Sequence, residues 1–138
     1  MKTGRVMIFH MSRILILFAI CAAVVSAQDE TAYSAWMKGV PPQVAAIRAA
    51  IMANDNAKVA AEANKLADTF EQVADFWAKR QKDDAVKMAQ ATRDAAKEVA
   101  GATGADARNA GVMKIQGTCG ACHRVYREGT AGAYKIKS

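Results

Sequence analysis

The sequence predicts an all-α protein, a four-helix up-and-down bundle. Alanine, the best helix former, fills 27 of the 111 positions after residue 27, and no stretch sustains the alternation of β-branched and polar residues expected of strands. Apolar residues recur at helical spacing in four segments of similar length. Because the connections between these segments are short, successive helices should run antiparallel.

Residues 1–27 have the features of a secretory signal peptide. Three basic residues precede an uninterrupted apolar run over 14–25, and Val25-Ser26-Ala27 offers small residues for cleavage. As a helix, this run would span about 18 Å, which is well short of the roughly 30 Å hydrocarbon core of a membrane. We therefore expect cleavage after Ala27, export to the periplasm, and a single domain over 28–138 with no stable membrane anchor.

Removing residues 1–27 changes the charge and the cysteine count. The formal charge of +6 falls to +3, with 16 Lys and Arg against 13 Asp and Glu. No cluster of basic residues interleaved with aromatic ones remains, which argues against nucleic acid as a partner. Two cysteines and one histidine are left, Cys119, Cys122 and His123.

The first helical region carries apolar residues at helical spacing between Tyr33 and Ile51, but Gly39 and the pair Pro41-Pro42 interrupt it. Proline costs roughly 3 kcal/mol inside a helix and is tolerated in the first turn. We therefore expect a short helix, a break, and a second helical piece that begins at Pro42.

The next two helices have clearer patterns. One buried stripe runs along the second helix, and Asn54, Asp55 or Asn56 can cap its start. The basic run Lys79–Lys82 suits its C-terminal end. A third helix should begin at Asp83 and end at Gly101. The predicted core residues of these two helices are Val59, Ala63, Leu66, Phe70, Val73, Trp77, Ala85, Met88, Ala89, Thr92, Ala96 and Val99.

The last helix is expected from about Asp106 to Arg127, ending before Gly129. It directs Val112, Ile115, Cys119, Cys122 and Tyr126 toward one side. The tail Tyr134–Lys137 should be loosely held.

Cys119, Cys122 and His123 form a C-x-x-C-H motif, which is the attachment signal for a c-type haem. Two thiols three residues apart on a helix lie about one turn apart, so both can reach the vinyl groups along one edge of a porphyrin. The adjacent imidazole can turn toward the iron. The sequence thus predicts one covalently bound haem c.

Other chemistries of the motif have less support. Zinc would need a fourth ligand, and no further Cys or His follows residue 27. A thioredoxin-like dithiol needs a helix N-terminus in a βαβ setting, whereas this pair lies deep in a helix. A disulfide across so short a loop would stabilise little and would leave His123 without a role.

A haem would also fill space in the core. A chain with 27 alanines and a single leucine after residue 27 has little side-chain volume for the centre of a bundle. Aromatic residues could contact the ring, although each of them is more simply a core residue. The candidates are Trp36, Phe70, Phe76, Trp77 and Tyr126.

A four-helix bundle with C-x-x-C-H on its last helix, continued as C-H-x-x-Y-R by Tyr126 and Arg127, resembles the class II cytochromes c, the cytochrome c prime family. The resemblance covers the whole of 28–138. It implies that Cys119 and Cys122 hold the haem, that His123 is the proximal ligand, and that Arg127 lies near the proximal face and a propionate. It also implies that two copies can associate through their first two helices.

The ligand opposite His123 decides the function. Met113 lies ten residues earlier on the same helix, about 15 Å along its axis, and cannot reach the other haem face. Met52 and Met88 are more simply flexible core residues. Met37 is the best candidate, since Trp36-Met37-Lys38 resembles the pattern of low-spin family members.

The sequence therefore favours a periplasmic cytochrome that carries single electrons between redox partner proteins, with Met37 and His123 on the iron. The alternative is a five-coordinate, high-spin cytochrome c prime that binds nitric oxide or carbon monoxide. We do not expect an enzyme, because a peroxidase would need a second histidine as distal acid and base.

Overall fold

The structure is a computed structural model, and it describes residues 29–137. The signal peptide expected over 1–27 lies outside these residues. The chain divides into two compact units, Met1–Ala35 and Trp36–Ser138. The packing discussed below belongs to the second unit. No helix in the described part of the chain is long and apolar enough to cross a membrane.

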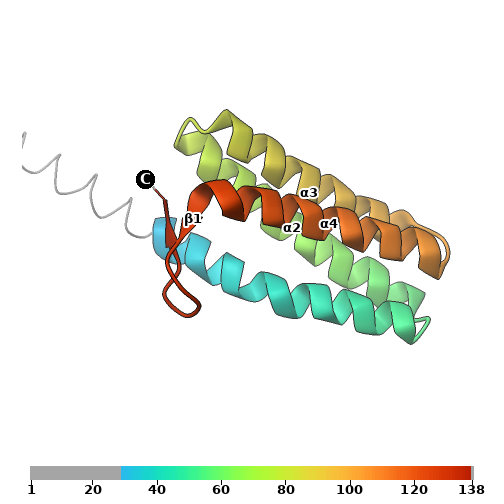
Figure 1. Cartoon of the computed structure of the whole chain (residues 1–138). Helices are drawn as coiled ribbons and strands as arrows, with labels where there is room; N and C mark the ends of the chain where they lie inside the picture. The colour runs from blue at the N-terminus through green and yellow to red at the C-terminus, as the bar shows by residue number, and fades with distance from the viewer. Residues whose placement is uncertain (1–28, 138) are drawn as a thin grey trace, which may run out of the picture. The chain divides into compact units, whose positions relative to one another are not determined.

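The described chain is almost entirely helical and has four helices, as predicted. The first covers residues 29–52, and the others are α2 (Asn56–Lys79), α3 (Asp83–Gly101) and α4 (Ala105–Tyr126). The paired residues of α3 and α4 show that the two helices run antiparallel. Glu98 accepts a hydrogen bond from Lys114, and Asp84 accepts one from Tyr126. Residue numbers along α3 therefore fall as those along α4 rise. In Figure 1, residues 36–52 of the first helix run lengthwise beside α2, α3 and α4.

The expected break in the first helical region is wrong, because helix 29–52 continues through Pro41 and Pro42. Both prolines are exposed, so their rings lie on the outer side of the helix. Ile47, Ala50 and Ile51 are buried on its inner side. Burial of a large aliphatic side chain is worth about 1.5–3 kcal/mol, so Ile47 and Ile51 together offset much of the cost of the two prolines.

The predicted stripe of α2 is confirmed. Every one of its six residues is buried, and Trp77 is only 1% exposed. Among the three candidate caps, Asp55 is the N-cap, and its carboxylate accepts from the backbone N–H of Lys58 at 3.0 Å. The helix ends at Lys79, inside the basic run.

The expected start and end of α3 are also confirmed. The helix directs small residues toward its neighbours, and Ala85, Ala89, Ala96 and Val99 are buried. Gly111 of α4 packs directly against this face. A Cβ atom at position 111 would lie 2.5 Å from Cγ2 of Val99, so only glycine allows the two helices to approach this closely.

A buried arginine joins three segments near the start of α4. Arg108 is 8% exposed, and its Nε donates to the carbonyl of Ala102 at 3.1 Å. The same guanidinium donates to the side chain of Asn56 at the start of α2. The α3–α4 connection is therefore tied to the first turn of α2.

The chain after α4 folds back as a small hairpin, so the expectation of a loose tail is wrong. Strand β1 (Arg127–Glu128) pairs antiparallel with β2 (Lys135–Ile136). Gly129 allows the turn with a φ of 93°, and a side chain there would collide with the carbonyl oxygen of Ala133. The N–H of Lys137 donates to the carbonyl of Tyr126 at 2.9 Å, so the hairpin is attached to the end of α4.

The contact at Gly111 gives a test of the packing. Gly111→Ala should lower the free energy of unfolding by about 1–3 kcal/mol, because overpacking outweighs the helix propensity of alanine. Gly117→Ala, on the same helix with nothing within 4 Å, should instead raise it by about 0.5–1 kcal/mol. Urea unfolding followed by circular dichroism measures both. Equal effects of the two substitutions would contradict a tight contact at Gly111.

Candidate functional site

Cys119, Cys122 and His123 lie in the last two turns of α4, and all three are half-buried. The two cysteines are free thiols. Their spacing on a continuous helix places both on one side, about one turn apart, with the imidazole beside the second. The structure therefore presents two thiols and a nitrogen donor from one short stretch of backbone.

The burial of α4 changes along its length. All of its buried residues, Arg108, Gly111, Val112 and Ile115, lie in the first half of the helix. From Thr118 to Tyr126 no residue is fully buried, although the stretch includes several small apolar residues. The second half of α4 is therefore only partly covered by the residues that the structure describes.

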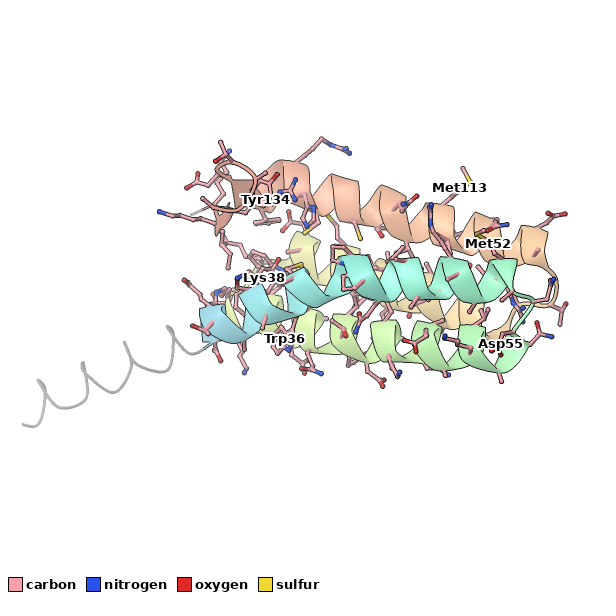
Figure 2. The ribbon with its side chains drawn as sticks, turned by 90° about the horizontal axis from the view of Figure 1, so that it is seen from below. Trp36, Lys38, Met52, Asp55, Met113 and Tyr134 are labelled. Carbon is pink, nitrogen blue, oxygen red and sulfur yellow. The ribbon has the colours of Figure 1, made fainter. Side chains whose placement is uncertain are left out.

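The part of the first helix that belongs to the second unit shows the same change along its length. Met37, Val40 and Val44 are half-buried, whereas Ile47 and Ile51 are fully buried. Because the helices are antiparallel, the half-buried part of this helix lies at the same end of the bundle as the half-buried part of α4. Figure 2 shows Trp36, Lys38 and Tyr134 at this end, and Met52, Asp55 and Met113 at the other.

Hydrogen bonds between helices place Met37 relative to the motif. Nη2 of Arg48 donates to Oε1 of Gln116 at 2.8 Å, so these two turns lie side by side. Counting eleven residues outward from each places Met37 level with about residue 127.

A second count of residues goes from the first helix to α4 by way of α2 and α3, using one hydrogen bond between each pair of neighbouring helices. It places Met37 at the level of about residue 121 of α4. The two counts lie on either side of His123, so Met37 and His123 are within about one helical turn of each other along the bundle axis. The hydrogen bonds used are Gln43 with Thr69, Arg93 with Glu71, and Thr92 with Thr118.

Burial keeps the donor atoms of the motif uncharged near neutral pH. It raises the pKa of the Cys119 thiol and raises that of Cys122 to about 11. It also lowers the pKa of His123, and the nearby charge of Arg127 lowers it further. A neutral imidazole has a free lone pair, which is the form that coordinates a metal.

An aromatic pair lies beside the motif. The rings of Trp77 and Tyr126 have centroids 4.6 Å apart, and Phe76 meets Trp77 edge-on at 5.2 Å. The hydroxyl of Tyr126 donates to the carboxylate of Asp84 at 2.5 Å. Asp84 thereby connects the first turn of α3 to the last turn of α4.

The five candidate aromatic residues fall into two groups. Phe70, Phe76 and Trp77 are buried in the core, whereas Trp36 and Tyr126 are half-buried. Tyr126 is the only one of the five that belongs to the helix of the motif. Trp36 lies at the same end of the bundle, one residue before Met37.

Arg127 stands in strand β1, immediately after α4, and is exposed. Its guanidinium carbon lies 4.1 Å from the centre of the Tyr134 ring. This cation–π contact helps to hold the hairpin closed. This contact could not be predicted from the sequence, because the tail has no periodic pattern of apolar residues.

The other methionines are only partly as expected. Met88 is half-buried, but Met52 is 83% exposed, so its expected place in the core is wrong. It follows Ile51 at the end of the first helix, where the chain leaves the core. Met113, which the helix geometry excludes as a ligand, is 70% exposed.

Two threonines support the motif, and sequence analysis did not single out their contact. The hydroxyls of Thr92 and Thr118 lie 2.7 Å apart across α3 and α4, and Thr92 also donates to the carbonyl of Met88. This contact fixes α4 one residue before Cys119. Thr92 was recognisable as a core residue from its spacing, but its partner was not.

The hydrogen bond of Tyr126 has a measurable pH signature. It raises the pKa of Tyr126 to about 12, because Asp84 holds the phenolic proton. Asp84→Asn should lower this pKa toward the ordinary value of about 10, whereas Asp83→Asn, at the exposed neighbour, should leave it unchanged. Ultraviolet titration of tyrosinate measures it, with Tyr126→Phe identifying the transition. A pKa unaffected by Asp84→Asn would contradict the contact.

The same shift sets the pH range over which this bond stabilises the fold. Because the folded pKa lies above the unfolded one, the stabilisation is complete below about pH 10. It is lost as the pH rises through about 12.

Within residues 29–137, no group of three or more His, Cys, Asp and Glu side chains is arranged to hold a metal ion. Comparison of the chain with protein-family models, curated proteins and solved structures gives no match. The interpretation of the site therefore depends on its residues and their geometry.

Proposed function

We propose that this protein is an exported c-type cytochrome that carries single electrons. The observation that carries the proposal is the placement of Cys119, Cys122 and His123 together on one half-buried stretch of α4. This donor set is the one that attaches haem c, and it lies at the end of the bundle where two helices are only partly covered. The secretory signal peptide that the sequence predicts over 1–27 supports a periplasmic location.

The residues present fit a haem. Two thiols one turn apart would hold it through thioether bonds, and the neutral imidazole of His123 would be the proximal ligand. The half-buried apolar residues Val40 and Val44 suit one wall of an apolar cofactor site. Haem, when bound, supplies an iron that accepts and releases one electron.

Met37 is the proposed second ligand. It lies within about one turn of the level of His123 and comes from a different helix, so it can approach from the opposite side. A methionine ligand fills the last iron position and raises the reduction potential, which favours electron transfer over ligand binding. Arg127, four residues after His123, is proposed to lie near a propionate.

A second candidate function is binding of nitric oxide or carbon monoxide to a five-coordinate iron. The backbone beside Met37 favours it. Pro41 has no N–H, so the carbonyl of Met37 loses the donor that a helix normally supplies. A ligand on such a weakened turn is displaced more easily, and Val40 and Val44 would then line an open, apolar distal side.

The covalent attachment can be tested directly. Protein expressed with its own leader alongside a periplasmic haem-attachment system should carry one haem that acid acetone cannot extract. The double variant Cys119→Ser/Cys122→Ser should lose all covalent haem, while Thr118→Ser, next to the motif, should keep it. Absence of covalent haem in the wild type would overturn the proposal.

Substitution of Met37 distinguishes the two candidates. If the protein is an electron carrier with Met37 on the iron, Met37→Ala should abolish the methionine-to-iron charge-transfer band of the ferric protein and lower its reduction potential. Met88→Ala removes a half-buried methionine from α3 and serves as the matched control, with no expected change in the spectrum.

Carbon monoxide provides the complementary measurement. Reduced wild type should bind it slowly or not at all, and Met37→Ala should bind it promptly. Prompt binding by the wild type, with a ferric spectrum that Met37→Ala leaves unchanged, would rule out Met37 as ligand and favour the five-coordinate protein.

A further inference from the structure

The positive charge of the protein is concentrated at one end of the bundle. We define the motif end as residues 36–40, 75–89 and 121–137, which lie at the level of the C-x-x-C-H motif, and the packed half as residues 41–74 and 90–120. The motif end holds nine Lys and Arg and four Asp and Glu, whereas the packed half holds seven of each. The unit over 36–137 therefore carries a charge of +5 at one end and zero at the other. The remaining two acids of the described chain, Asp29 and Glu30, belong to the first unit.

Four ion pairs neutralise charges of the packed half. Lys65–Glu62, Arg93–Glu71, Arg93–Asp94 and Lys114–Glu98 all lie in the packed half. In the described part of the chain, no carboxylate lies within ion-pair distance of the exposed lysines of the motif end. These lysines are Lys38, Lys79, Lys82, Lys87, Lys135 and Lys137.

The unpaired lysines come from separate elements that meet at this end. Lys38 is on the first helix, and Lys79 and Lys82 flank the turn between α2 and α3. Lys87 is on α3, and Lys135 and Lys137 are on or beside strand β2. Figure 2 shows Lys38 and Tyr134 at the same end of the bundle. The fold thus gathers positive charge that the sequence distributes over about 100 positions.

We propose that the motif end is a docking surface for an acidic protein that exchanges electrons with this one. The inference rests on the proposed function and names the partner class of the same site. Unpaired surface cations attract an opposite charge over about 8 Å at physiological salt and about 30 Å at low salt. They would orient an acidic partner so that it meets the bundle at the thiols and His123. Electrostatic complementarity of this kind selects partners and speeds association.

The arrangement favours a protein partner over an anionic membrane. Binding in a membrane surface needs a helix with a broad apolar face and aromatic anchors. The large hydrophobic residues that are exposed at the motif end are only Val125 and Tyr134, among the residues described, and Tyr134 already packs under Arg127. Asp83 and Glu128 interrupt the positive surface, which suits a partner with a matching pattern of charges.

A nuclear magnetic resonance titration tests the docking surface. Isotope-labelled, haem-loaded protein is titrated with a strongly acidic flavodoxin at low salt. Shifts should concentrate at residues 79–82, 124–128 and 134–137, and the affinity should fall by about tenfold or more toward physiological salt. Shifts concentrated in the packed half would overturn the proposal. In a parallel titration, vesicles of phosphatidylglycerol that bind while flavodoxin does not would overturn it in favour of a membrane.

Two double variants with the same change in net charge distinguish binding at the motif end from an effect of net charge alone. Lys82→Glu/Lys137→Glu should weaken flavodoxin binding by about tenfold at low salt. Lys58→Glu/Lys97→Glu changes the net charge equally at two exposed lysines of the packed half, and should change the affinity less than about twofold. An equal loss in both would contradict a docking end. Circular dichroism confirms that each variant is folded.

The docking surface can fail independently of the proposed function. Protein that carries covalent haem but shows no localised shifts with flavodoxin would refute the docking proposal alone. Localised shifts on protein that never acquires haem would refute the proposed cytochrome function. They would still support the motif end as a docking surface for an acidic protein. The titration needs no electron transfer, so the two results cannot be confused.

Discussion

The close approach of α3 and α4 at Gly111 is the constraint on which the rest of the structure depends. With only a hydrogen atom at position 111, Val99 fills the space that a side chain would occupy, and the two backbones lie close together. The Thr92–Thr118 contact and the Tyr126–Asp84 hydrogen bond lie further along the same interface. These contacts can form only because the register is already set, and they fix the turns that carry the cysteines and His123.

The bundle divides its limited side-chain volume between a packed half and a partly covered end. Alanine-rich helices fill space only when they come close together, as in the half around Ala96, Val99, Gly111 and Ile115. At the other end the aromatic residues of α2 occupy one side, and the second half of α4 has no fully buried residue. The donor set of the proposed haem lies at this partly covered end.

Helices with one strong apolar stripe could be predicted nearly to the residue. In α2, for example, every residue of the predicted stripe is buried. The prediction of a break at Pro41 and Pro42 was wrong for a physical reason. The cost of a proline inside a helix can be read from the sequence, whereas the burial of Ile47 and Ile51 that offsets much of this cost depends on the fold. The hairpin depends on a cation–π contact and a single backbone bond to Tyr126, neither of which leaves a periodic signal. The motif could be read directly from the sequence. Its supporting contacts and the clustering of charge around it required the fold, because they join residues that are far apart in the chain.

The position of the thiols has a consequence for the order of assembly. Synthesis of the chain proceeds from its N-terminus, and Cys119 and Cys122 belong to the last helix to be made. The core of the packed half uses residues up to Ile115 and none of the attachment turn. A group joined to these thiols can therefore be added to a chain whose packed half is already formed.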